Sequence, residues 1–586
     1  MWLAFVGFCL ASDNGQIAWE HSPDKAFERA RTEKRCVILD LEAIWCHWCH
    51  VMDEKTYSDP RVAKLLNEHF VALKVDQDSR PDFSNRYEEY GWPATILFGP
   101  DGKELVKRSG YIAPDDMVSL LEAIVRDPTP GPSAAPVARI QYSGEGALSV
   151  DQRRDLEEKH FARYDAKMGG WGTFHKFLNA DCVEYAMMRA AEGDARSEKM
   201  ARQTLDAQRK LIDPVWGGVY QYSTDGDWDH PHFEKIMSVQ GDNLRIYAQA
   251  YAFWNEPEYL KAAQSIHRYL RDFMMSPDGV FYTSQDADVV QGRHSGDYFK
   301  LGDQERRAQG IPRIDTHVYA RENGWAIQGL CALYGATGDR TVRDEAIRAA
   351  NWMMAHRALP RGGFRHDAAD ASGPYLGDTL SMGQAMLALY TVTGDREWLK
   401  RAENAAVFIS KHFRNGTDKN AAGFLAADPS TAKGVQPEPQ LDENIRLVRF
   451  ASLLHQNTGE SAYQEMAKQG MRYLSTPAVI EKKFAMVAGF LLADRELATE
   501  PVHVTVVGSK KDASAQALFE AALKYPFVYR RIEWFDRREG NPRRADVEYP
   551  EFDEAAAFFC GQGRCSTPIF KVDALLAKIQ HSLKRS

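Results

Sequence analysis

The first 126 residues alternate helix-like and strand-like spacing of apolar positions. An amphipathic segment begins at Ser22-Pro23, where proline suits the first helical turn, and the β-branched run "CVILDLEA" follows it. A helix opening at Asp59-Pro60 precedes the strand "FVALKVD". Next come "GWPATILFGPDGKELVKRSGY", which predicts two strands around a Pro-Asp-Gly turn, and a last helix from Pro114. With the opening helix set aside, the order βαβαββα predicts an α/β domain over residues 12–126.

The pattern changes after a proline-rich linker, residues 127–144. From 145 to 500 only helical spacing recurs, interrupted by the glycine-aromatic turns "GGWG", "GGVY", "DGVF", "GGF" and "AGF". The stretches "LYGATGD" and "LYTVTGD" mark helix ends with glycine as the stop signal. The intervals suit one or two helix hairpins each, so we expect a divergent repeat of antiparallel helix pairs that closes into a toroid around a central pocket.

Strand signals return in the C-terminal region, residues 501–586. The run "VHVTVVGS", a helix at about 512–524, the strand "VYRRIEWF", the run "AAAFFC" and a final helix from Lys571 predict a small α/β module. The expected fold class is therefore multidomain, with α/β domains at both ends of an all-α toroid.

Composition and charge exclude several classes of protein. The chain has 586 residues and a net charge of -9, without the clustered basic face of nucleic-acid binders, so we expect no nucleic-acid partner. No apolar run reaches the roughly 18 residues that span a bilayer.

The start of the chain, Met1 to Ala11, is apolar and ends in Cys9-Leu10-Ala11, which resembles a signal-peptide cleavage site although basic residues are missing. We therefore expect a signal peptide over residues 1–11 and a periplasmic or secreted mature chain with no stable membrane span. The alternative is a buried N-terminal strand in a cytoplasmic protein.

The nonapeptide "IWCHWCHVM" admits three chemistries. Its Cys46-His47-Trp48-Cys49-His50 core satisfies the C-x-x-C-H pattern of haem attachment, but it follows a buried strand directly and runs into a helix, which leaves no exposed loop for a haem. Zinc or copper suits these side chains, yet neighbours on one helical turn point about 100° apart and can hardly converge on one ion. We expect no metal and no other cofactor, with ligation by His47 and His50 as the weaker alternative. A redox dithiol fits best, because a helix N-terminus lowers the pKa of the Cys46 thiol and Cys49 lies one turn on as the resolving thiol.

Residues on both sides of the dithiol give it a family resemblance. The stretch "LDLEAIWCHWC" is similar to the active-site strand of thioredoxins, in which an acidic residue six positions before the first cysteine lies beneath the dithiol. Asp40 stands at that position, and the resemblance implies that it accepts the proton of the Cys49 thiol. Trp92 and Pro93 in "GWPATILF" resemble the cis-proline loop that faces the dithiol and pairs with a bound peptide backbone. The resemblance implies that Cys46, Cys49, Asp40, Trp92 and Pro93 form the catalytic site.

A longer stretch extends the resemblance to one family. The segment "CHWCHVMDEKTYSDPRVAKLLNEHFVALKVDQDSRPD" resembles the thioredoxin-like domain of the spermatogenesis-associated thioredoxin-domain family, whose members continue into a helical toroid. "GGVYQYS", "PHFEKIMSVQGDNL" and "FYTSQDAD" resemble that family's ring motifs, and "FFCGQGRCSTPI" resembles its C-terminal cysteine pair. The resemblance covers about residues 19–580. It implies an (α/α)6 toroid similar to sugar 2-epimerases and six-hairpin glycosidases.

The chain departs from the family pattern in the ring. The stretch from Gln240 to Asn243 replaces a tyrosine-aspartate-asparagine, His175 stands where a proline is usual, and "QPEPQLDENIRLVRF" replaces a serine-glycine-asparagine-serine stretch. The segment between Gly292 and Pro312 is also short. These departures weaken the transfer of a sugar-related activity.

Polar residues at the expected loops and helix starts of the ring form a second candidate site. The stretch "DHPHFEK" puts two imidazoles and a carboxylate within five residues, and acid/base chemistry on a sugar needs such a pair near an aromatic-lined cleft. The alternative is a structural role, with caps at helix ends and aromatics in the core. The candidates are His175, Tyr222, Asp229, His230, His232, Glu234, Asp286, Asp288, Arg321, Glu322, Asp378, Asp442 and Glu443, with Trp171, Trp216, Tyr220, Trp228 and Trp325 as aromatics able to stack on a sugar.

Four other cysteines carry different expectations. Cys182 and Cys331 lie in apolar helical patterns and are expected in the core. Cys560 and Cys565 flank a glycine-containing turn, where a structural disulfide is favoured over a relay that receives electrons from the dithiol. The dithiol pair, Cys46–Cys49, would form the other disulfide of the oxidised protein.

The sequence thus favours a thiol-disulfide oxidoreductase or redox-responsive protein. Its expected partners are a protein thiol or disulfide client or a small saccharide in the toroid. The alternative is a carbohydrate-active enzyme, epimerase-like or glycosidase-like, with a regulatory thioredoxin-like domain; a third option is a scaffold without turnover. The client, the direction of electron flow and the oligomeric state stay open at this point.

Overall fold

The computed structural model describes residues 16–134, 140–370, 372–416, 420–431, 436–561 and 563–583. Contacts divide the chain into two units. The first contains the described residues within Met1–Ala138 together with Val290–His294, and the second contains those within Arg139–Val289 and Ser295–Ser586. The expected signal peptide, residues 1–11, lies outside the described residues.

A four-stranded sheet in the order β2-β1-β3-β4 forms the centre of the first unit. The strands are β1 (Cys36–Glu42), β2 (Phe70–Asp76), β3 (Ala94–Phe98) and β4 (Glu104–Ser109). β1 pairs parallel with β2 and antiparallel with β3, and β4 completes the antiparallel edge. A parallel pair needs a crossover connection, which the helices between β1 and β2 provide. The βαβαββα order expected from the sequence is present, and the fold is thioredoxin-like.

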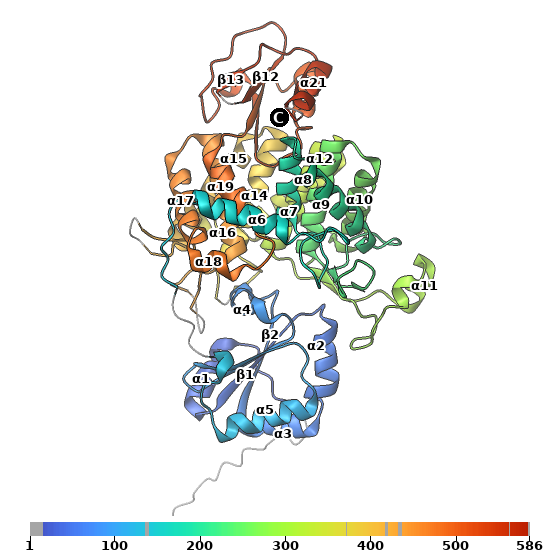
Figure 1. Ribbon diagram of the computed structural model, residues 1–586, viewed down its shortest axis with the longest axis vertical. Coiled ribbons are helices and arrows are strands. Elements are labelled where there is room, and N and C mark those ends of the chain that lie inside the picture. The colour runs from blue at the N-terminus through green and yellow to red at the C-terminus, as the bar shows by residue number, and fades with distance from the viewer. Residues whose placement is uncertain are drawn as a thin grey trace, which may run out of the picture. The chain divides into compact units, whose positions relative to one another are not determined.

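Helices cover both faces of this sheet (Figure 1). They are α1 (Pro23–Glu33), α2 (His47–Met52), α3 (Pro60–His69), α4 (Pro81–Tyr87) and α5 (Pro114–Arg126). Ile38, Leu66 and Leu121 belong to a buried cluster that joins β1, α3 and α5. On the other face the ring of Phe27 packs edge-on against Phe98, with 5.1 Å between the ring centroids. The sheet is therefore the middle layer between helices on its two faces.

The segment Val290–His294 is part of the first unit. The ring of His294 lies 5.8 Å from the ring of His47, at the start of α2. Gly292 has a φ of +77°, and a Cβ built there would lie 2.6 Å from Glu54 Oε2. The segment therefore lies against residues 47–57, and the positive φ favours glycine at its centre.

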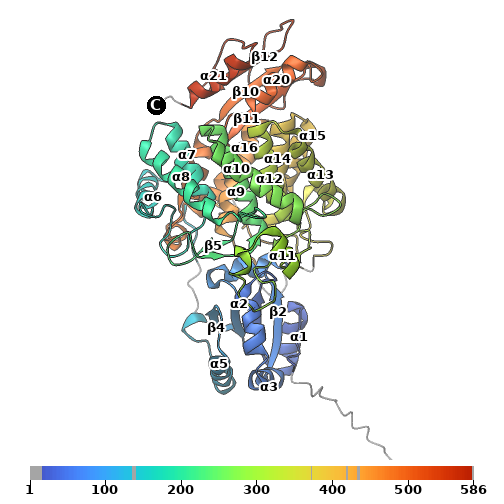
Figure 2. The same cartoon turned by 90° about the vertical axis from the view of Figure 1, so that its right-hand side faces the viewer.

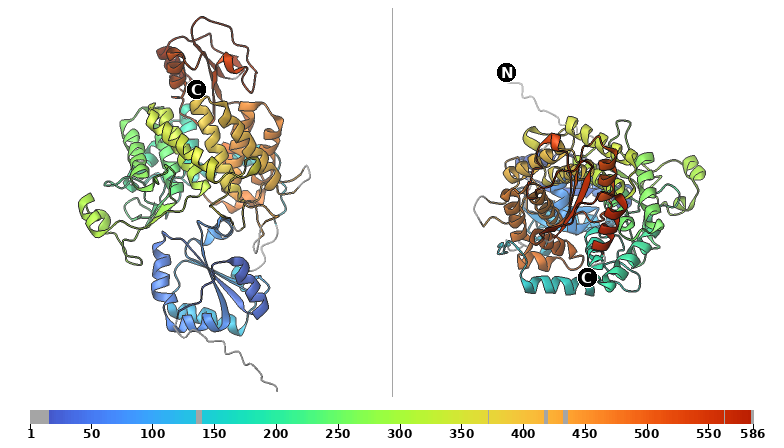
Figure 3. Two further views of the ribbon diagram at one scale, coloured as in Figure 1. Left: turned by 180° about the vertical axis from the view of Figure 1, so that it is seen from behind. Right: turned by 90° about the horizontal axis from the view of Figure 1, so that it is seen from above.

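Six inner helices form a closed ring in the second unit. They are α7 (Ala180–Ala191), α9 (Met237–Trp254), α12 (Ala320–Thr337), α14 (Leu376–Thr393), α16 (Leu441–Thr458) and α19 (Ala488–Ala498). Each contacts the next, and α19 contacts α7. The partners on the outside are α8 (Ala195–Gln208), α10 (Pro257–Tyr269), α13 (Arg340–His356), α15 (Arg396–His412), α17 (Ser461–Leu474) and α6 (Val150–Ala162). The view from above in Figure 3 shows these helices around a common centre. The expected (α/α)6 toroid is confirmed.

Glycine ends three of the inner helices. Gly338, Gly394 and Gly459 follow α12, α14 and α16 with φ between +65° and +79°, and each donates its N–H back into the last helical turn. This left-handed conformation suits glycine, because it has no Cβ to clash. The "TGD" and "TGE" stretches are thus the helix ends that the sequence indicates.

The region 145–500 is not purely helical, which corrects the sequence interpretation. Short strands connect the helices: β5 (Tyr222–Ser223), β6 (Pro231–His232), β7 (Lys235–Ile236), β8 (Ser284–Gln285) and β9 (Ile314–Asp315). β5 pairs with β6, while β7, β8 and β9 form a three-stranded sheet. Two-residue strands are too short to show an alternating pattern. Two short helices, α11 (Asp303–Gln309) and α18 (Pro477–Lys482), lie in further connections.

The C-terminal module of the second unit has a four-stranded sheet in the order β11-β10-β12-β13 (Figure 2). Its strands are β10 (Val502–Val507), β11 (Arg530–Phe535), β12 (Ala556–Gly561) and β13 (Arg564–Cys565), and its helices are α20 (Ala513–Ala522) and α21 (Val572–Ser582). β11 contacts the inner helices α14 and α16. Among the described residues, no helix combines the length and apolarity needed to cross a bilayer.

Candidate functional sites

The two dithiol cysteines lie where β1 passes into α2. Cys46 is the N-cap of α2, and its Sγ accepts a hydrogen bond from the Cys49 backbone N–H at 3.1 Å. The two sulfur atoms are joined as a disulfide. A helix N-terminus presents unpaired N–H groups and the positive end of the helix dipole, which stabilise a thiolate once the disulfide is reduced.

Aromatic side chains surround the dithiol. Trp45 donates from Nε1 to Asp78 Oδ2 at 2.7 Å, and its ring lies 6.0 Å from the ring of Trp92. The Trp92–Pro93 peptide bond is cis. Trp48, which stands between the two cysteines, is 46% exposed. The exposed Trp48 ring thus offers an apolar surface within the motif itself.

Asp40 is buried on β1, six residues before Cys46. The Lys74 Nζ lies 3.3 Å from Asp40 Oδ2, 3.0 Å from Glu42 Oε2 and 2.5 Å from Asp53 Oδ1. Burial raises the pKa of Asp40 to about 7, although the Lys74 charge opposes the shift. Burial acts to lower the pKa of Lys74, but the charges of the three carboxylates outweigh burial and raise that pKa. Asp40 therefore exchanges its proton near neutral pH while Lys74 stays charged.

The carboxylates of Asp40, Glu42 and Asp53 come within 4.8 Å of one another, close enough to share a cation. Oxygen donors of this kind suit a hard divalent ion. The Lys74 ammonium already lies among them. These three carboxylates are therefore the ion-pair partners of Lys74 in an internal charge cluster.

Four of the predicted ring residues come together around β5 and β6. The Tyr222 ring stacks on His232 at 4.4 Å and also lies 4.8 Å from the ring of His175. His232 Nδ1 lies 3.9 Å from Glu234 Oε2, and Glu234 is buried. Burial and the Glu234 charge raise the pKa of Tyr222 to about 12. We call His175, Tyr222, His232 and Glu234 the hairpin cluster.

Two neighbours in "DHPHFEK" lie apart from the hairpin cluster. His230 Nδ1 bonds Asp227 Oδ1 at 2.9 Å on the surface. Asp229 forms an exposed ion pair with Lys210, with 2.8 Å between Nζ and Oδ2. Both side chains stabilise the turn between β5 and β6.

A second buried cluster includes Asp378. Its Oδ1 accepts hydrogen bonds from the Arg321 backbone N–H and from His366 Nδ1, each at 2.9 Å. Arg321 in turn forms a bidentate pair with Glu322 Oε1 at 2.7 and 2.9 Å. Burial lowers the pKa of His366, but the Asp378 charge outweighs it and raises that pKa to about 9. His366 was missed in the sequence because it stands alone in a loop.

The remaining carboxylates have separate local partners. Asp286 and Asp288 are buried, and Asp286 Oδ1 accepts from the Asp288 backbone N–H at 2.9 Å. Asp442 is half exposed and lies 3.7 Å from Lys483 Nζ. The neighbouring Glu443 backbone N–H is capped by Gln440.

Most of the aromatics expected to stack on a sugar belong to the core. Trp171, Trp216, Tyr220 and Trp228 are all buried in the main hydrophobic cluster. Trp325 differs, because the Arg321 and Arg446 guanidinium groups lie 5.0 and 5.5 Å from its ring centre. The sugar-platform interpretation of the first four is therefore wrong, and packing decides their positions.

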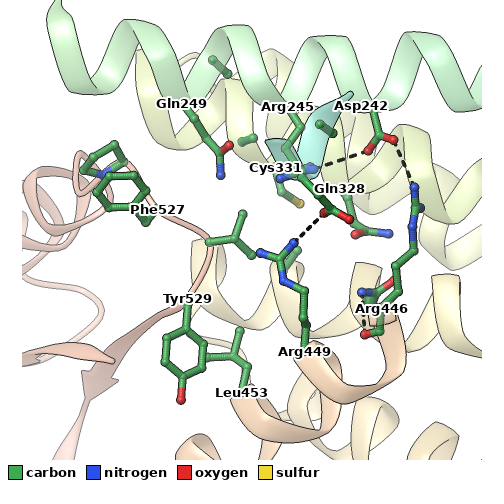
Figure 4. Close-up of a pocket in the computed structure, with 18 of the residues that line it drawn as sticks. Asp242, Arg245, Gln249, Gln328, Cys331, Arg446, Arg449, Leu453, Phe527 and Tyr529 are labelled. Carbon is green, nitrogen blue, oxygen red and sulfur yellow. Dashed lines mark hydrogen bonds and ion pairs between the residues drawn. The ribbon is translucent and has the colours of Figure 1, made fainter. Parts of the chain in front are cut away.

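The inner helices enclose a cavity of about 320 Å³ that the sequence interpretation missed. Figure 4 shows Asp242, Arg245 and Gln249 on one wall, with Arg446 and Arg449 opposite. The only local signal is a pair of charges three residues apart within apolar helices, in "DNLR" and "RLVR". Such spacing puts both side chains on one helix face.

An ion-pair network crosses this cavity. Arg449 pairs with Glu184 at 2.7 Å and with Glu496 at 2.9 Å, and Arg245 pairs with the second Glu184 oxygen at 2.7 Å. Burial acts to raise the pKa of Glu184, but the two arginines lower it to about 2. Burial raises the pKa of Glu496 to about 7 against the pull of Arg449. The network joins α7, α9, α16 and α19 across the ring.

The architecture therefore defines a thioredoxin-like domain joined to an (α/α)6 toroid with a C-terminal α/β module. Residues 6–126 match the family model Thioredox_DsbH, described as a protein of unknown function, DUF255. Residues 221–474 match the catalytic-domain model of the GH127 beta-L-arabinofuranosidases. Similarity to spermatogenesis-associated protein 20 of Homo sapiens, 28% identical over 46% of this chain and 39% of that protein, confirms the family resemblance. The chain is therefore similar to the spermatogenesis-associated thioredoxin-domain proteins over part of its length.

Two other relatives cover different parts of the chain. Uncharacterized protein B0495.5 of Caenorhabditis elegans is 22% identical over 91% of this chain and 80% of its own length. Thiol:disulfide interchange protein DsbD of Campylobacter jejuni (strain RM1221) is 29% identical over 16% of this chain and 17% of its own length. The chain thus spans less than half of the human relative and a small part of the DsbD protein.

Solved structures resemble the toroid at low sequence identity. A cellobiose 2-epimerase from Bacillus thermoamylovorans B4167 is 11% identical, covers 56% of this chain and 87% of its own, and gives a TM-score of 0.43. A D-mannose isomerase is 13% identical, covers 60% of this chain and 98% of its own, and also gives 0.43.

Proposed function

We propose that the first unit is a thiol-disulfide oxidoreductase that acts on a client through Cys46 and Cys49. The observation that carries the proposal is the position of Cys46 as the N-cap of α2, one helical turn from Cys49 and on the strand that holds Asp40. The match of residues 6–126 to a thioredoxin-like family model adds support. The similarity to a thiol:disulfide interchange protein is consistent with the same chemistry.

The reaction begins from the reduced dithiol. The Cys46 thiolate attacks one sulfur of a client disulfide, forms a mixed disulfide and releases the other client sulfur as a thiolate. The Cys49 thiol then loses its proton and attacks Cys46 Sγ, which closes the Cys46–Cys49 disulfide and releases the second client thiolate. Two electrons pass from the dithiol to the client. Every step is reversible, so an oxidising compartment would run the same chemistry in the opposite direction.

Asp40 supplies the acceptor for the Cys49 proton. A carboxylate with the usual pKa near 4 is too weak a base to deprotonate a thiol efficiently, whereas a pKa of about 7 matches a neutral medium. Lys74 stays close to the carboxylate and stabilises its charged form when the proton has left. Pro93 presents its neighbouring backbone to the client, and the exposed Trp48 gives the client an apolar contact.

Trapping of mixed disulfides tests the proposal. In a Cys49→Ser variant of the full chain, Cys46 can attack a client but nothing resolves the product, so specific client adducts should accumulate in the native cell. The matched control is Cys46→Ser with Cys49 intact, which should trap far less. A second control, Cys36→Ser combined with Cys49→Ser, should trap as much as Cys49→Ser alone, because Cys36 is half-buried and outside the motif. An absence of adducts on Cys46 would rule the function out.

The compartment is a proposal of its own. We propose that the protein works in an oxidising compartment outside the cytoplasm, because both closely spaced cysteine pairs are joined as disulfides. Rapid acid quenching and alkylation of the native protein should leave Cys560 and Cys565 unmodified. Full alkylation of this pair in the cell would contradict the proposed compartment.

A carbohydrate-active toroid is the second candidate function. It is favoured by the match of residues 221–474 to the beta-L-arabinofuranosidase model and by the hairpin cluster, where His232 and Glu234 lie 3.9 Å apart. Such a pair can give and take a proton at a glycosidic oxygen. The test is release of nitrophenol from p-nitrophenyl β-L-arabinofuranoside, with Glu234→Gln as the variant and Glu256→Gln on the surface as the control. No release above the Glu234→Gln background would exclude this activity.

A further inference from the structure

The cavity inside the ring has two unlike ends. Toward the starts of the inner helices its lining is charged, with Asp181 on α7 and Asp442 on α16. At the other end, Leu523 and residues 525–530 close the cavity just before β11. We call this end the module end, because it lies against the C-terminal module. Its lining is mostly apolar and includes Ala252, Ala332, Ala336, Leu387, Val392 and Phe527.

Arg530 supplies the positive charge of the module end. Its side chain is buried, and Nη1 donates to the backbone carbonyls of Leu523, at 2.9 Å, and of Tyr525. Among the described residues Arg530 forms no ion pair, and its Nε and Nη2 make no hydrogen bond. Burial lowers the pKa of Arg530 to about 10, so the group stays charged at neutral pH. A buried cation held only by neutral groups carries a desolvation cost that a bound anion offsets.

The other described cations of the lining are already paired. Glu496, near the end of α19, is in turn held by Arg449 at 2.9 Å. An anion inside the cavity is therefore drawn to Arg530 and not to the network nearer the helix starts. The pairs are Arg245 and Arg449 with Glu184, Arg446 with Asp242, and Lys483 with Asp442 at 3.7 Å.

Gln249 adds a polar group to the module end. Its side chain is 4% exposed, and neither Oε1 nor Nε2 has a hydrogen-bond partner among the described residues. Figure 4 shows this amide directed into the cavity between Phe527 and Cys331. Buried amides are normally satisfied, so an amide left open toward a cavity indicates a ligand that completes its hydrogen bonds.

Gln249 and Arg530 lie at the same level of the ring. Gly241 on α9 lies against Trp325 on α12, and the contact of Gly329 with Leu244 shows that the two helices run parallel. Two turns after Gly241, Gln249 is therefore level with residues 331–335 of α12. Arg530 Nη2 is in the same layer, because a Cβ built on Gly335 would come within 3.3 Å of it.

The charge and the walls of the module end define the ligand that fits it. A planar carboxylate matches the edge of a guanidinium group and also accepts from an amide N–H. Arg530 balances one negative charge, whereas a second would be buried without a partner. The apolar walls favour an apolar body. The whole cavity measures about 320 Å³, which limits the ligand to a small molecule.

We propose that the module end binds a small monocarboxylate with an apolar body, its carboxylate held by the Arg530 guanidinium and the Gln249 amide. The site lies near the ends of α9, α12 and α14, and the cavity includes no residue of the hairpin cluster. It rests on neither proposed activity, so failure of the dithiol or glycosidase tests leaves it standing.

Binding of hexanoate to the full chain tests the site, with hexanamide as the uncharged counterpart. Isothermal titration calorimetry should show saturable hexanoate binding with a Kd of about 1 mM or lower, at least about tenfold tighter than hexanamide. Arg530→Gln should weaken hexanoate binding at least about tenfold and leave hexanamide binding unchanged. The matched control is Arg268→Gln on α10, an exposed arginine that also donates to a backbone carbonyl, and it should change neither affinity.

A second variant covers the case in which Arg530→Gln does not fold. Ala332 lines the module end from α12, and a leucine there occupies the space of the ligand body. Ala332→Leu should therefore weaken both hexanoate and hexanamide at least about tenfold. Gln264→Leu, on the exposed face of α10, is its control and should bind as the wild type does.

Four results would overturn the proposal. The first is that hexanoate does not bind, and the second is that hexanamide binds as tightly as hexanoate. The third is that succinate or inorganic phosphate binds as tightly as hexanoate, because the module end balances a single charge. The fourth is unchanged hexanoate binding in a folded Arg530→Gln or Ala332→Leu protein.

Discussion

Lys74 lies directly opposite Asp40 in the parallel register of β1 and β2, with 3.3 Å between Nζ and Oδ2. Both side chains are largely buried, and Glu42 and Asp53 complete the charge cluster. In this arrangement the Asp40 carboxyl group is half-ionised near neutral pH. Lys74 stays charged beside it, both when the carboxyl group is protonated and when it is ionised. This pair therefore links the proposed dithiol chemistry to the stability of the domain.

Replacing Asp40 with asparagine should flatten the pH dependence of disulfide resolution. In the wild type, resolution by Cys49 should become faster as the pH rises through about 7, because Asp40 loses its proton there. In Asp40→Asn the rate should fall by roughly 10²–10⁴-fold at pH 7, the usual contribution of a positioned base. The measurement is stopped-flow tryptophan fluorescence during reoxidation of the reduced dithiol. A variant with the wild-type pH profile would remove Asp40 from the mechanism.

The same variant should be more stable than the wild type at high pH. The folded-state pKa of Asp40 is raised to about 7 from 3.8, so its contribution to stability is present in full below about pH 4 and is lost as the pH rises through 7. Asp40→Asn removes this loss, and we expect it to be more stable at pH 8 by roughly 1–4 kcal/mol, with the difference vanishing near pH 4. Urea denaturation from pH 4 to pH 8 measures it. Asp53→Asn, which changes the exposed member of the cluster, is the control and should show a much smaller difference.

The sequence predicted one half of this pair and missed the other. Asp40 was found by its fixed distance from Cys46 along a single strand, and Trp92-Pro93 was found as a local dipeptide. Lys74 lies in the next strand, and only the register of β1 against β2 places it opposite Asp40. Pairing between strands is a non-local property, so a single sequence read along the chain does not contain it in a local pattern.

The His366–Asp378 pair should make the ring lose stability in alkaline solution. The His366 pKa is raised from 6.5 to about 9, so its contribution is complete below pH 6.5 and disappears as the pH passes 9. The His366–Asp378 pair is also faced by three charged side chains, those of Arg321, Glu322 and Asp370. Their charges take part in the same titration. Asp378→Asn should lower the free energy of unfolding by about 3 kcal/mol at pH 6 and remove most of the decline between pH 6.5 and 9. Denaturation of both proteins at four pH values tests it. An equal decline in the variant would contradict the assignment.

The ring shows the same limit of local sequence patterns. The hairpin cluster was predicted because three of its four residues stand within thirteen positions. The cavity network was not, since Glu184, Arg245, Arg449 and Glu496 come from four helices spread over more than 300 residues. Helical spacing identified each helix but carried no information about which helices share the centre of the ring.

Removal of the C-terminal disulfide should cost little stability and no redox activity. Cys560 and Cys565 join the ends of the short β12–β13 hairpin, and a loop this small constrains the unfolded chain by only about 2 kcal/mol. The double variant Cys560→Ser/Cys565→Ser should therefore unfold about 2 kcal/mol more easily and should trap clients on Cys46 as the parent does in the Cys49→Ser background. Loss of turnover with retained trapping would instead identify this pair as an electron relay.

The most destabilising single change should be at Asp213, which balances two buried cations. Its carboxylate bonds Arg306 Nη1 at 2.8 and 3.0 Å and Lys235 Nζ at 2.8 Å, and all three side chains are excluded from water. Burial lowers the pKa of Lys235 to about 8 even with this partner, so an uncharged partner would leave two positive groups uncompensated. We expect Asp213→Asn to lose about 3–5 kcal/mol of unfolding free energy, the range for breaking a buried pair from one side.

The matched control for this prediction is Asp206→Asn. Asp206 lies exposed on α8, where an ion pair is screened by solvent, and the change should stay within about 0.5 kcal/mol. Raising the pH from 7 to 9 should restore part of the lost stability in Asp213→Asn, because Lys235 then sheds its charge. Equal stability of the two variants at pH 7 would show that Asp213 does not hold these cations in the folded protein.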